Sequence, residues 1–454
     1  MAQMYAMVNC FQYPRTSIRM TVNSSLDPKR SIPHHVELNL GDKTLDRSLL
    51  GLYAMNGGKG ANSYAQNSSY QRGVVDAAKP LIEAEIATKV DIKQLSSTNT
   101  TPFRIADFGC STGHNSFPAI QIITEAVEKK IQTQAQIPDF HVFFNDQVMN
   151  DFNTLFHSLP PQRNYHAAGV PGPFHGRLLP NASIDFAYSS CALNWLSEVP
   201  KAVADHRSPA WNNGKVHYTG ARKEVFEAYS NHYANDIDSF LKARAEELVG
   251  GGLMALLVPA VPTFENSGTS YTTPTEMDLI GSCLVDMAKK VNFQYFNSQS
   301  KLAHLFLDLS KFCIITESQQ YDIDIDQKKY SYGVLNLFLL QGILSEEQVD
   351  TFNFPLYFTI PQELKAIIER NHSFSIERME ILNNPGKRTL TSASARATYL
   401  RAVFEGLLIN HFGTEIMDEL FDRYTEKLAA SPLFLDPENE KSIIIFVLLE
   451  RKVV

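Results

Sequence analysis

A short turn with two glycines, placed between an apolar segment and an amphipathic helix, is the feature that most restricts the fold of this chain. The apolar run from Phe103 to Phe108 stops at Gly109 and Gly113, which flank small polar residues. Apolar side chains then recur with helical spacing from about residue 119 to 131. A strand, a glycine turn and a helix form the first unit of a parallel sheet, and such sheets hold a ligand at the carboxyl end of that strand.

The spacing of these glycines excludes two common nucleotide motifs. Dinucleotide-binding folds use G-x-G-x-x-G and P-loops use G-x-x-x-x-G-K-S/T, but neither pattern fits Gly109 and Gly113. The triplet Asp107-Phe108-Gly109 occurs in kinases, yet the other kinase motifs are missing. An acid before a short glycine turn instead suits a ligand with a cationic amino acid end and an adenosine end, such as S-adenosylmethionine. An ordinary strand–helix turn is the alternative interpretation.

Polar residues also follow two other predicted strands. The strand at 140–144 leads to Asp146, whose carboxylate can accept hydrogen bonds from both hydroxyls of a ribose; a helix cap is the simpler alternative. The strand at 184–188 leads to Asn194 and Trp195, which suit an apolar pocket with one hydrogen-bonding group, or equally core packing.

Two glycine-containing segments predict loops. The polar segment 55–71 precedes a helix at about 71–95, and it is either a turn with a helix cap or a lid that closes over a small ligand. The segment 167–178 is rich in glycine and proline.

The alternation of elements predicts the fold class. Further helices are expected near 222–248, 274–290, 361–370, 392–409 and 414–429, and further strands near 253–258, 373–382 and 442–450. Strands alternating with helices indicate an α/β fold with a doubly wound, Rossmann-like sheet. We expect the folded domain to span 51–454, with a helical cap made by about 200–250 and 270–430. Residues 1–50 lack periodicity and predict an unpacked N-terminal extension.

The composition of the chain indicates which kinds of partner and which cellular compartment to expect. The 454-residue chain has a formal net charge of −8 and no dense cluster of lysine and arginine, so we expect no nucleic-acid partner. No apolar run is long enough to span a bilayer, so we expect no membrane partner. The five cysteines are scattered without a C-x-x-C pair, which indicates a reducing, cytoplasmic location.

Ordered segments of the chain resemble the plant SABATH family of S-adenosylmethionine-dependent methyltransferases. The matching segments are MNGGKGxNSYxxNSxxQ, ADFGCSTGxN, FxNDxxxNDFN, GVPGxFxGRLxP and SSxxLxWLSxVP, followed by HYTG, FLxARAEEL, GGLM and SEEQVDxFNxP. They cover roughly 53–290 and 342–452 in the family's order. The resemblance implies a Rossmann-like class I methyltransferase sheet with a helical cap, S-adenosyl-L-methionine as cofactor, and a homodimer.

The resemblance also implies site residues, carried over position by position. The cofactor contacts would be Tyr64, Ser68, Asp107, Gly109, Cys110, Asn115, Asp146, Gln147, Pro173 and Phe174. Asp146 would hold the ribose and Phe174 would flank the adenine. The acceptor would contact Gln71, Asn194, Trp195, Cys191 and Asn56. Some members place a cation near positions matching Asn212, Asp350, Phe352 and Asn353, so Mg²⁺ is a candidate ion.

The implied reaction is methyl transfer to the carboxylate of a small plant metabolite, giving a methyl ester. A carboxylate with a pKa near 4 is already ionised at pH 7, so no general base is needed and catalysis rests on alignment. The matching segments are most similar to the loganate-type group, which points to a terpenoid acid. At Pro173 the family's usual serine is lost. Alternatives are a xanthine or alkaloid N-methyltransferase and an inactive binding homologue.

One segment has no counterpart in the family. Removing residues 291–341 joins Lys290 to Gly342 and restores a family-like helix and turn. The segment begins with valine and ends with glutamine, whose codons can carry the GT and AG that mark the edges of an intron. An in-frame retained intron is therefore our hypothesis, and a real insertion in the cap is the alternative.

Overall fold

The computed structural model describes residues 54–90, 102–132, 137–264, 274–290, 344–382 and 384–453. Contacts between Cα atoms divide the chain into two units, Met1–Leu50 and Gly51–Val454, and all described residues belong to the second. The predicted extension at 1–50 and the predicted insertion at 291–341 lie outside the described residues.

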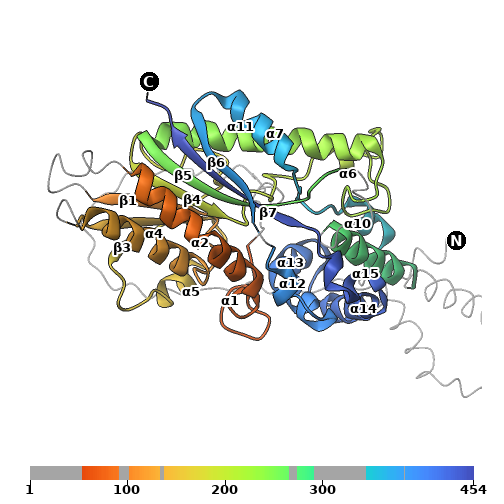
Figure 1. Ribbon diagram of the computed structural model, residues 1–454. Helices are drawn as coiled ribbons and strands as arrows, with labels where there is room; N and C mark the ends of the chain where they lie inside the picture. Colours follow the sequence, from red (N-terminus) through yellow and green to blue (C-terminus); the bar gives the residue numbers. More distant parts are fainter. Residues whose placement is uncertain are drawn as a thin grey trace, which may run out of the picture. The chain divides into compact units, whose positions relative to one another are not determined.

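A seven-stranded sheet forms the centre of the structure (Figure 1). Its strands are β1 (Phe103–Phe108), β2 (Phe140–Asp146), β3 (Tyr165–Pro171), β4 (Ile184–Ser190), β5 (Leu248–Ala260), β6 (Phe374–Leu382) and β7 (Ile443–Arg451). The spatial order is β3-β2-β1-β4-β5-β7-β6, and β7 alone runs antiparallel to its neighbours. From β1 the chain adds β2 and β3 on one side of the sheet and then β4 and β5 on the other side. At such a change of direction a crevice opens at the carboxyl ends of the strands. The predicted doubly wound sheet is present.

Helices cover both faces of the sheet. Helices α2 (Ser69–Lys89) and α4 (Ser116–Ile131) pack on one face, and α7 (Lys223–Glu247) and α11 (Pro361–Asn371) pack on the other (Figure 1). The alternation of side chains along β7 follows this arrangement. Ile444, Phe446 and Leu448 join the core under α2 and α4, whereas Ile445, Val447 and Leu449 join the core under α7.

A second group of helices forms the cap. The helix at 274–290, α13 (Ala393–Phe412) and α14 (Met417–Ala430) share a separate hydrophobic core. The short helices are α1 (Tyr64–Asn67), α5 (Phe152–His157), α6 (Lys201–Ala204), α10 (Glu346–Thr351), α12 (Gly386–Thr389), α15 (Pro432–Leu435) and the 3-10 turn Pro437–Asn439. Among the described residues, the predicted helical cap is made by segments at and after residue 274.

Two local predictions differ from the structure. The expected loop at 167–178 begins only after β3, because main-chain pairing with β2 extends the strand through Pro171. The expected cap at 200–250 contains α7, which packs on the sheet instead. Val225, Tyr229 and Phe240 of α7 are fully buried in the core that it shares with β4 and β5.

The turn after β1 requires glycine at two positions. Gly109 and Gly113 have φ angles of 90° and 86°. A Cβ atom on Gly109 would lie 2.3 Å from the Cβ of Ala192, and one on Gly113 would lie 2.3 Å from Phe117. The backbone N–H groups of Gly109 and Cys110 both donate to the carbonyl oxygen of Asn145, at 2.9 Å, which ties the turn to β2.

None of the helices described in the structure is long and apolar enough to cross a membrane.

Candidate active site

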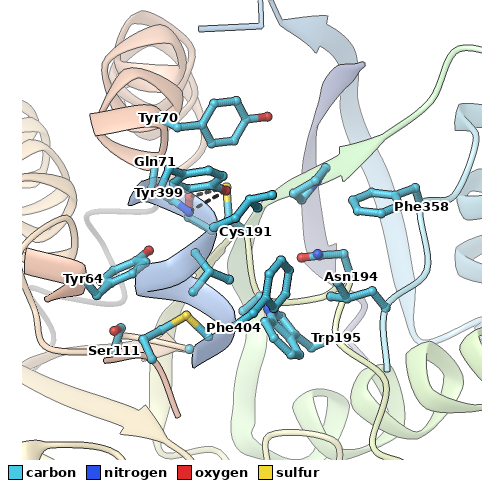
Figure 2. Close-up of a pocket in the computed structure, with 18 of the residues that line it drawn as sticks. Tyr64, Tyr70, Gln71, Ser111, Cys191, Asn194, Trp195, Phe358, Tyr399 and Phe404 are labelled. Carbon is cyan, nitrogen blue, oxygen red and sulfur yellow. Dashed lines mark hydrogen bonds between the residues drawn. The ribbon is translucent and has the colours of Figure 1, made fainter. Parts of the chain in front are cut away.

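A cavity that is partly open to solvent lies where β1, β2 and β4 end beneath the cap. The sheet contributes Gly109, Asp146 and Cys191 to its wall, and the cap contributes Tyr399 and Phe404. Figure 2 shows this arrangement, with Tyr64 and Gln71 approaching from the N-terminal helices and Trp195 and Phe404 lying beside each other. A smaller pocket continues from it along Asp107, Cys110, Asn115, Ser116 and Tyr188.

The polar segment 55–71 closes one side of the cavity. Its backbone is held from two directions: the N–H of Gly58 donates to Asp151 on the N-terminus of α5 over 2.9 Å, and the N–H of Asn56 donates to the carbonyl of Ala402 in α13 over 3.0 Å. Tyr64 and Gln71 line the cavity, as a lid would require. The structure places Asn56 differently from the prediction. Its side-chain amide donates to Glu405 over 2.6 Å and does not line the cavity, because it anchors the loop to the cap.

Two buried carboxylates lie at the ends of β1 and β2. Asp146 accepts the backbone N–H groups of Ser111 and Gln147, each at 2.7 Å. Burial raises the pKa of Asp146 to about 6, although these two N–H groups lower it in part. Burial raises the pKa of Asp107 to about 7; a hydrogen bond from Ser116 opposes this, and the nearby charge of Asp146 adds to it. Both groups would be stabilised as anions by a ligand that carries positive charge or hydroxyl donors.

Several polar atoms around these carboxylates have no hydrogen-bond partner within the protein. They are Asp107 Oδ2, Ser68 Oγ, Gln71 Oε1, Ser111 Oγ, Asn115 Oδ1 and the Tyr188 hydroxyl. Buried polar atoms are rarely left without partners, and a cluster of them indicates a bound polar ligand. Ser111 also has a positive φ of 49°, which directs its N–H towards Asp146. Ser111 is a lining residue that the sequence analysis missed.

A buried ion pair holds the segment that carries Phe174. Arg244 of α7 donates to the carbonyl oxygens of Phe174 and Gly176, at 2.7 and 2.9 Å, and to Glu247 at 2.8 Å. Phe174 lines the cavity, whereas Pro173 does not. The next residue, His175, also lines it and was missed from the sequence. Its Nδ1 is buried without a partner.

The remaining part of the cavity is largely aromatic and carries few polar groups. Gln71 donates its side-chain N–H to the hydroxyl of Tyr399 over 3.2 Å, shown as a dashed line in Figure 2. Trp195 packs against Phe404 with ring centroids 5.7 Å apart, and Asn194 Oδ1 has no partner. Cys191 has a φ of 55°. Several further residues line the cavity that were not predicted from the sequence, among them Met55, Tyr70, Glu276, Phe358, Tyr399, Phe404 and Glu440. Met55 begins one of the segments that resemble the family, whereas the others are not among the matching residues of those segments.

The residues proposed for a cation do meet, but they satisfy one another. Asn212 donates its side-chain N–H to Asn353 Oδ1 over 2.8 Å, and Asp350 accepts the N–H of Gly214 over 2.9 Å. Phe352 packs against Phe354 and Phe412. The Nδ2 of Asn353 is buried without a partner. Among the described residues, no three His, Cys, Asp or Glu side chains are grouped as metal ligands.

Comparison with known proteins assigns this site to a family. A model of S-adenosylmethionine-dependent carboxyl methyltransferases matches residues 51–297 and 313–452. This chain belongs to that family. The family model leaves only residues 298–312 unmatched within this range, so the segment without a counterpart is shorter than the predicted 291–341.

Curated relatives of this methyltransferase act on different acceptors. Loganic acid O-methyltransferase of Catharanthus roseus is 39% identical over 88% of this chain and 94% of the relative. Farnesoic acid carboxyl-O-methyltransferase of Arabidopsis thaliana is 35% identical over 83% of this chain and 92% of the relative. A 3,7-dimethylxanthine N-methyltransferase of Camellia sinensis var. assamica is 31% identical over 87% of this chain and 95% of the relative.

A solved structure supports the fold and the cofactor of this methyltransferase. A loganic acid methyltransferase bound to SAH, the demethylated form of the cofactor, superposes with a TM-score of 0.74 at 39% identity, covering 88% of this chain and 99% of the other. The predicted family, methyltransferase fold and S-adenosylmethionine dependence are thus confirmed.

Proposed function

We propose that this protein transfers the methyl group of S-adenosylmethionine to the carboxylate of a small acid and releases a methyl ester. The observation that carries the proposal is the division of the cavity. The buried acids Asp107 and Asp146 and several unpartnered polar atoms surround the glycine turn. The other end is formed mainly by aromatic rings and neutral polar groups, with Glu276 and Glu440 on one wall. No lysine or arginine is present among the described residues that line either part.

The acidic end suits the cofactor. Asp146, at the tip of β2, would accept hydrogen bonds from the ribose hydroxyls, and Asp107 would face the cationic amino acid end. The unpartnered Ser68, Ser111 and Asn115 would supply further hydrogen bonds. Phe174 would flank the adenine. His175 Nδ1, buried and without a partner, adds a polar group beside that ring.

The aromatic end suits the acceptor. The acceptor carboxylate would receive hydrogen bonds from Gln71 and Trp195, which offset the cost of its desolvation. Because no cationic side chain among the described lining residues is available, the positive sulfonium of the cofactor would be the main counter-charge. Attraction between the sulfonium and the carboxylate brings the two reactants together. It requires the cofactor to bind before, or together with, the acid.

The transfer needs no general base. A carboxylate oxygen attacks the methyl carbon, the C–S bond breaks, and its electron pair stays on sulfur, so the products are a neutral ester and a neutral thioether. No proton is moved. The protein's contribution is to align oxygen, carbon and sulfur and to exclude water. No step runs through a metal ion.

A labelled-methyl transfer assay against aromatic, jasmonate-like, terpenoid and xanthine acceptors tests the proposal. We expect a base-labile product from at least one acid. Gln71→Met should reduce kcat/KM for that acid by about 10- to 100-fold and should weaken the binding of S-adenosylhomocysteine much less. A base-stable product formed only from xanthines would show an N-methyltransferase. Cofactor binding without transfer to any acceptor would show an inactive binding homologue.

We further propose a cytoplasmic homodimer. The support is the family resemblance together with scattered cysteines, of which Cys110, Cys191 and Cys283 are free among the described residues. Light scattering at micromolar concentration tests the dimer, and a monomeric mass would contradict it. Fractionation of the native tissue tests the compartment.

A further inference from the structure

One wall of the cavity carries a buried triad of charged residues that the reaction described above does not use. Glu276, from the helix at 274–290, and Glu440, which precedes β7, both line the cavity. Arg396 of α13 lies between them and donates to Glu276 Oε1 over 2.9 Å and to Glu440 Oε2 over 2.8 Å. The exposed fractions of the three side chains are 2%, 2% and 4%.

The hydrogen bonds within the triad are incomplete. Glu440 Oε1 and Arg396 Nε are buried and have no partner. Arg396 also packs against the ring of Phe434, 5.5 Å from its centroid. One guanidinium is shared by two carboxyl groups, so it cannot balance the charge of both. Burying a carboxylate is unfavourable unless its free oxygens are hydrogen-bonded. The cavity is the side from which a ligand could supply that bond.

The triad belongs to the acceptor part of the cavity. Burial raises the pKa of Tyr399, and the charges of Glu276 and Glu440 add to that shift. Tyr399, which accepts the hydrogen bond from Gln71, lines the same cavity as the two glutamates, and so does Tyr70, whose ring lies 5.8 Å from that of Tyr399. A molecule whose carboxylate is held by Gln71 would therefore extend towards Glu276 and Glu440.

The chemistry of the triad selects the kind of group that it binds. A carboxylate oxygen accepts hydrogen bonds and donates none, so the ligand must carry a donor. Burial raises the pKa of Glu276 to about 7; Arg396 opposes the shift and Glu440 adds to it. A neutral hydroxyl satisfies this wall without adding a further buried charge.

We propose that Glu440 and Glu276, held by Arg396, form a hydroxyl-recognition subsite, so that the preferred acceptors are carboxylic acids with hydroxyl groups remote from the reacting carboxylate. This inference rests on the proposed function for its acceptor orientation. It identifies the triad as the element that separates hydroxylated acids from apolar acids of similar size. A buried acceptor left unpaired by an apolar acid weakens binding, and we expect a preference of about 10- to 100-fold in kcat/KM.

The test compares matched acids in the full-length enzyme. Cinnamic, 4-hydroxycinnamic and 3,4-dihydroxycinnamic acids form the series, because hydroxyl groups are added while the size of the acid changes little. Methyl transfer and binding to the S-adenosylhomocysteine complex are both measured, so the preference can be read even if turnover is absent. Failure of all methyl transfer would overturn the proposed function alone, whereas equal binding of apolar and hydroxylated acids would overturn the subsite alone.

Two variants assign the preference to the triad. Glu440→Gln keeps the shape but weakens the acceptor, and we expect the ratio between hydroxylated and apolar acids to fall at least fivefold, mainly through KM. The triple variant E276L/R396L/E440L replaces the whole triad with apolar groups, a change that buried ion networks often tolerate, and it should reverse the preference. Glu363→Gln, which alters a carboxylate bonded to Thr359 and Tyr357 outside the cavity, is the matched control. An unchanged ratio in a folded triple variant would disprove the assignment.

Discussion

The side-chain amide of Gln71 donates a hydrogen bond to the hydroxyl of Tyr399 over 3.2 Å, and this contact joins α2 to α13 across the edge of the cavity. One end of the contact belongs to the segment that closes over the site, and the other belongs to the cap. The bond fixes the plane of the Gln71 amide, so the remaining N–H can point to an acceptor carboxylate.

Replacing Tyr399 with phenylalanine should therefore affect the acceptor more than the cofactor. Loss of one neutral hydrogen bond is worth about 0.5–1.5 kcal/mol, and we expect KM for the acid to rise about two- to tenfold with little change in the Kd of S-adenosylhomocysteine. Steady-state kinetics and calorimetry measure the two effects. Tyr424→Phe is the control, because the Tyr424 hydroxyl is buried in the same cap without a partner. Equal effects of both variants would refute the positioning role.

Cofactor affinity should depend on pH in the range where the two buried carboxylates titrate. Burial raises the pKa of Asp107 to about 7 and that of Asp146 to about 6 in the free enzyme. A cationic, hydroxyl-bearing cofactor favours both anions, so protons compete with it as the pH falls. We expect the Kd of S-adenosylhomocysteine to rise by about tenfold or more between pH 8 and pH 5.5. Calorimetry at constant ionic strength measures the change.

Asp107→Asn separates the two titrations. In this variant the affinity for S-adenosylhomocysteine should be weaker at pH 8 and should no longer change with pH near pH 7. The change with pH near pH 6, which comes from Asp146, should remain. A wild-type Kd that is constant across this range would show that neither carboxylate ionises with cofactor binding.

Gly109 should not tolerate alanine. The positive φ strains any side chain, and the added Cβ would lie 2.3 Å from Ala192. Strain and overpacking together predict a loss of about 2–5 kcal/mol in the free energy of unfolding and a weaker cofactor site. Gly60→Ala is the control, because a Cβ there meets no atom within 4 Å. Chemical denaturation compares the two, and a stable Gly109→Ala variant would contradict the geometry of the turn.

The buried pair Arg244–Glu247 should be essential to stability. Both side chains are fully buried, and Arg244 also holds the carbonyl of Phe174. Arg244→Met leaves Glu247 without a counter-charge, which predicts a loss of about 3–5 kcal/mol and a poorer adenine site. Arg207→Met breaks the exposed pair with Asp205 and should leave the unfolding midpoint unchanged. Thermal unfolding with and without S-adenosylhomocysteine tests both expectations.

The sequence by itself determined the elements whose structure is local. The apolar run before Gly109 predicted a buried strand and the two glycines after it predicted a turn, and the structure has both, with a positive φ at each glycine. The acid at the tip of β2 was placed by the same parallel pairing. Hydrophobic periodicity and the conformational preferences of turn residues depend on residues close together in the chain. A single sequence is therefore enough to predict the elements that they form.

Only the tertiary structure decided the features made by distant segments. Gln71 and Tyr399 are 328 residues apart, and Arg396 lies 120 residues from Glu276 and 44 from Glu440. Asn56 was expected in the acceptor pocket, yet Glu405 of α13 holds its side chain outside. Such contacts depend on how the cap packs against the sheet, and neither hydrophobic period nor local conformation records which polar side chains that packing brings together.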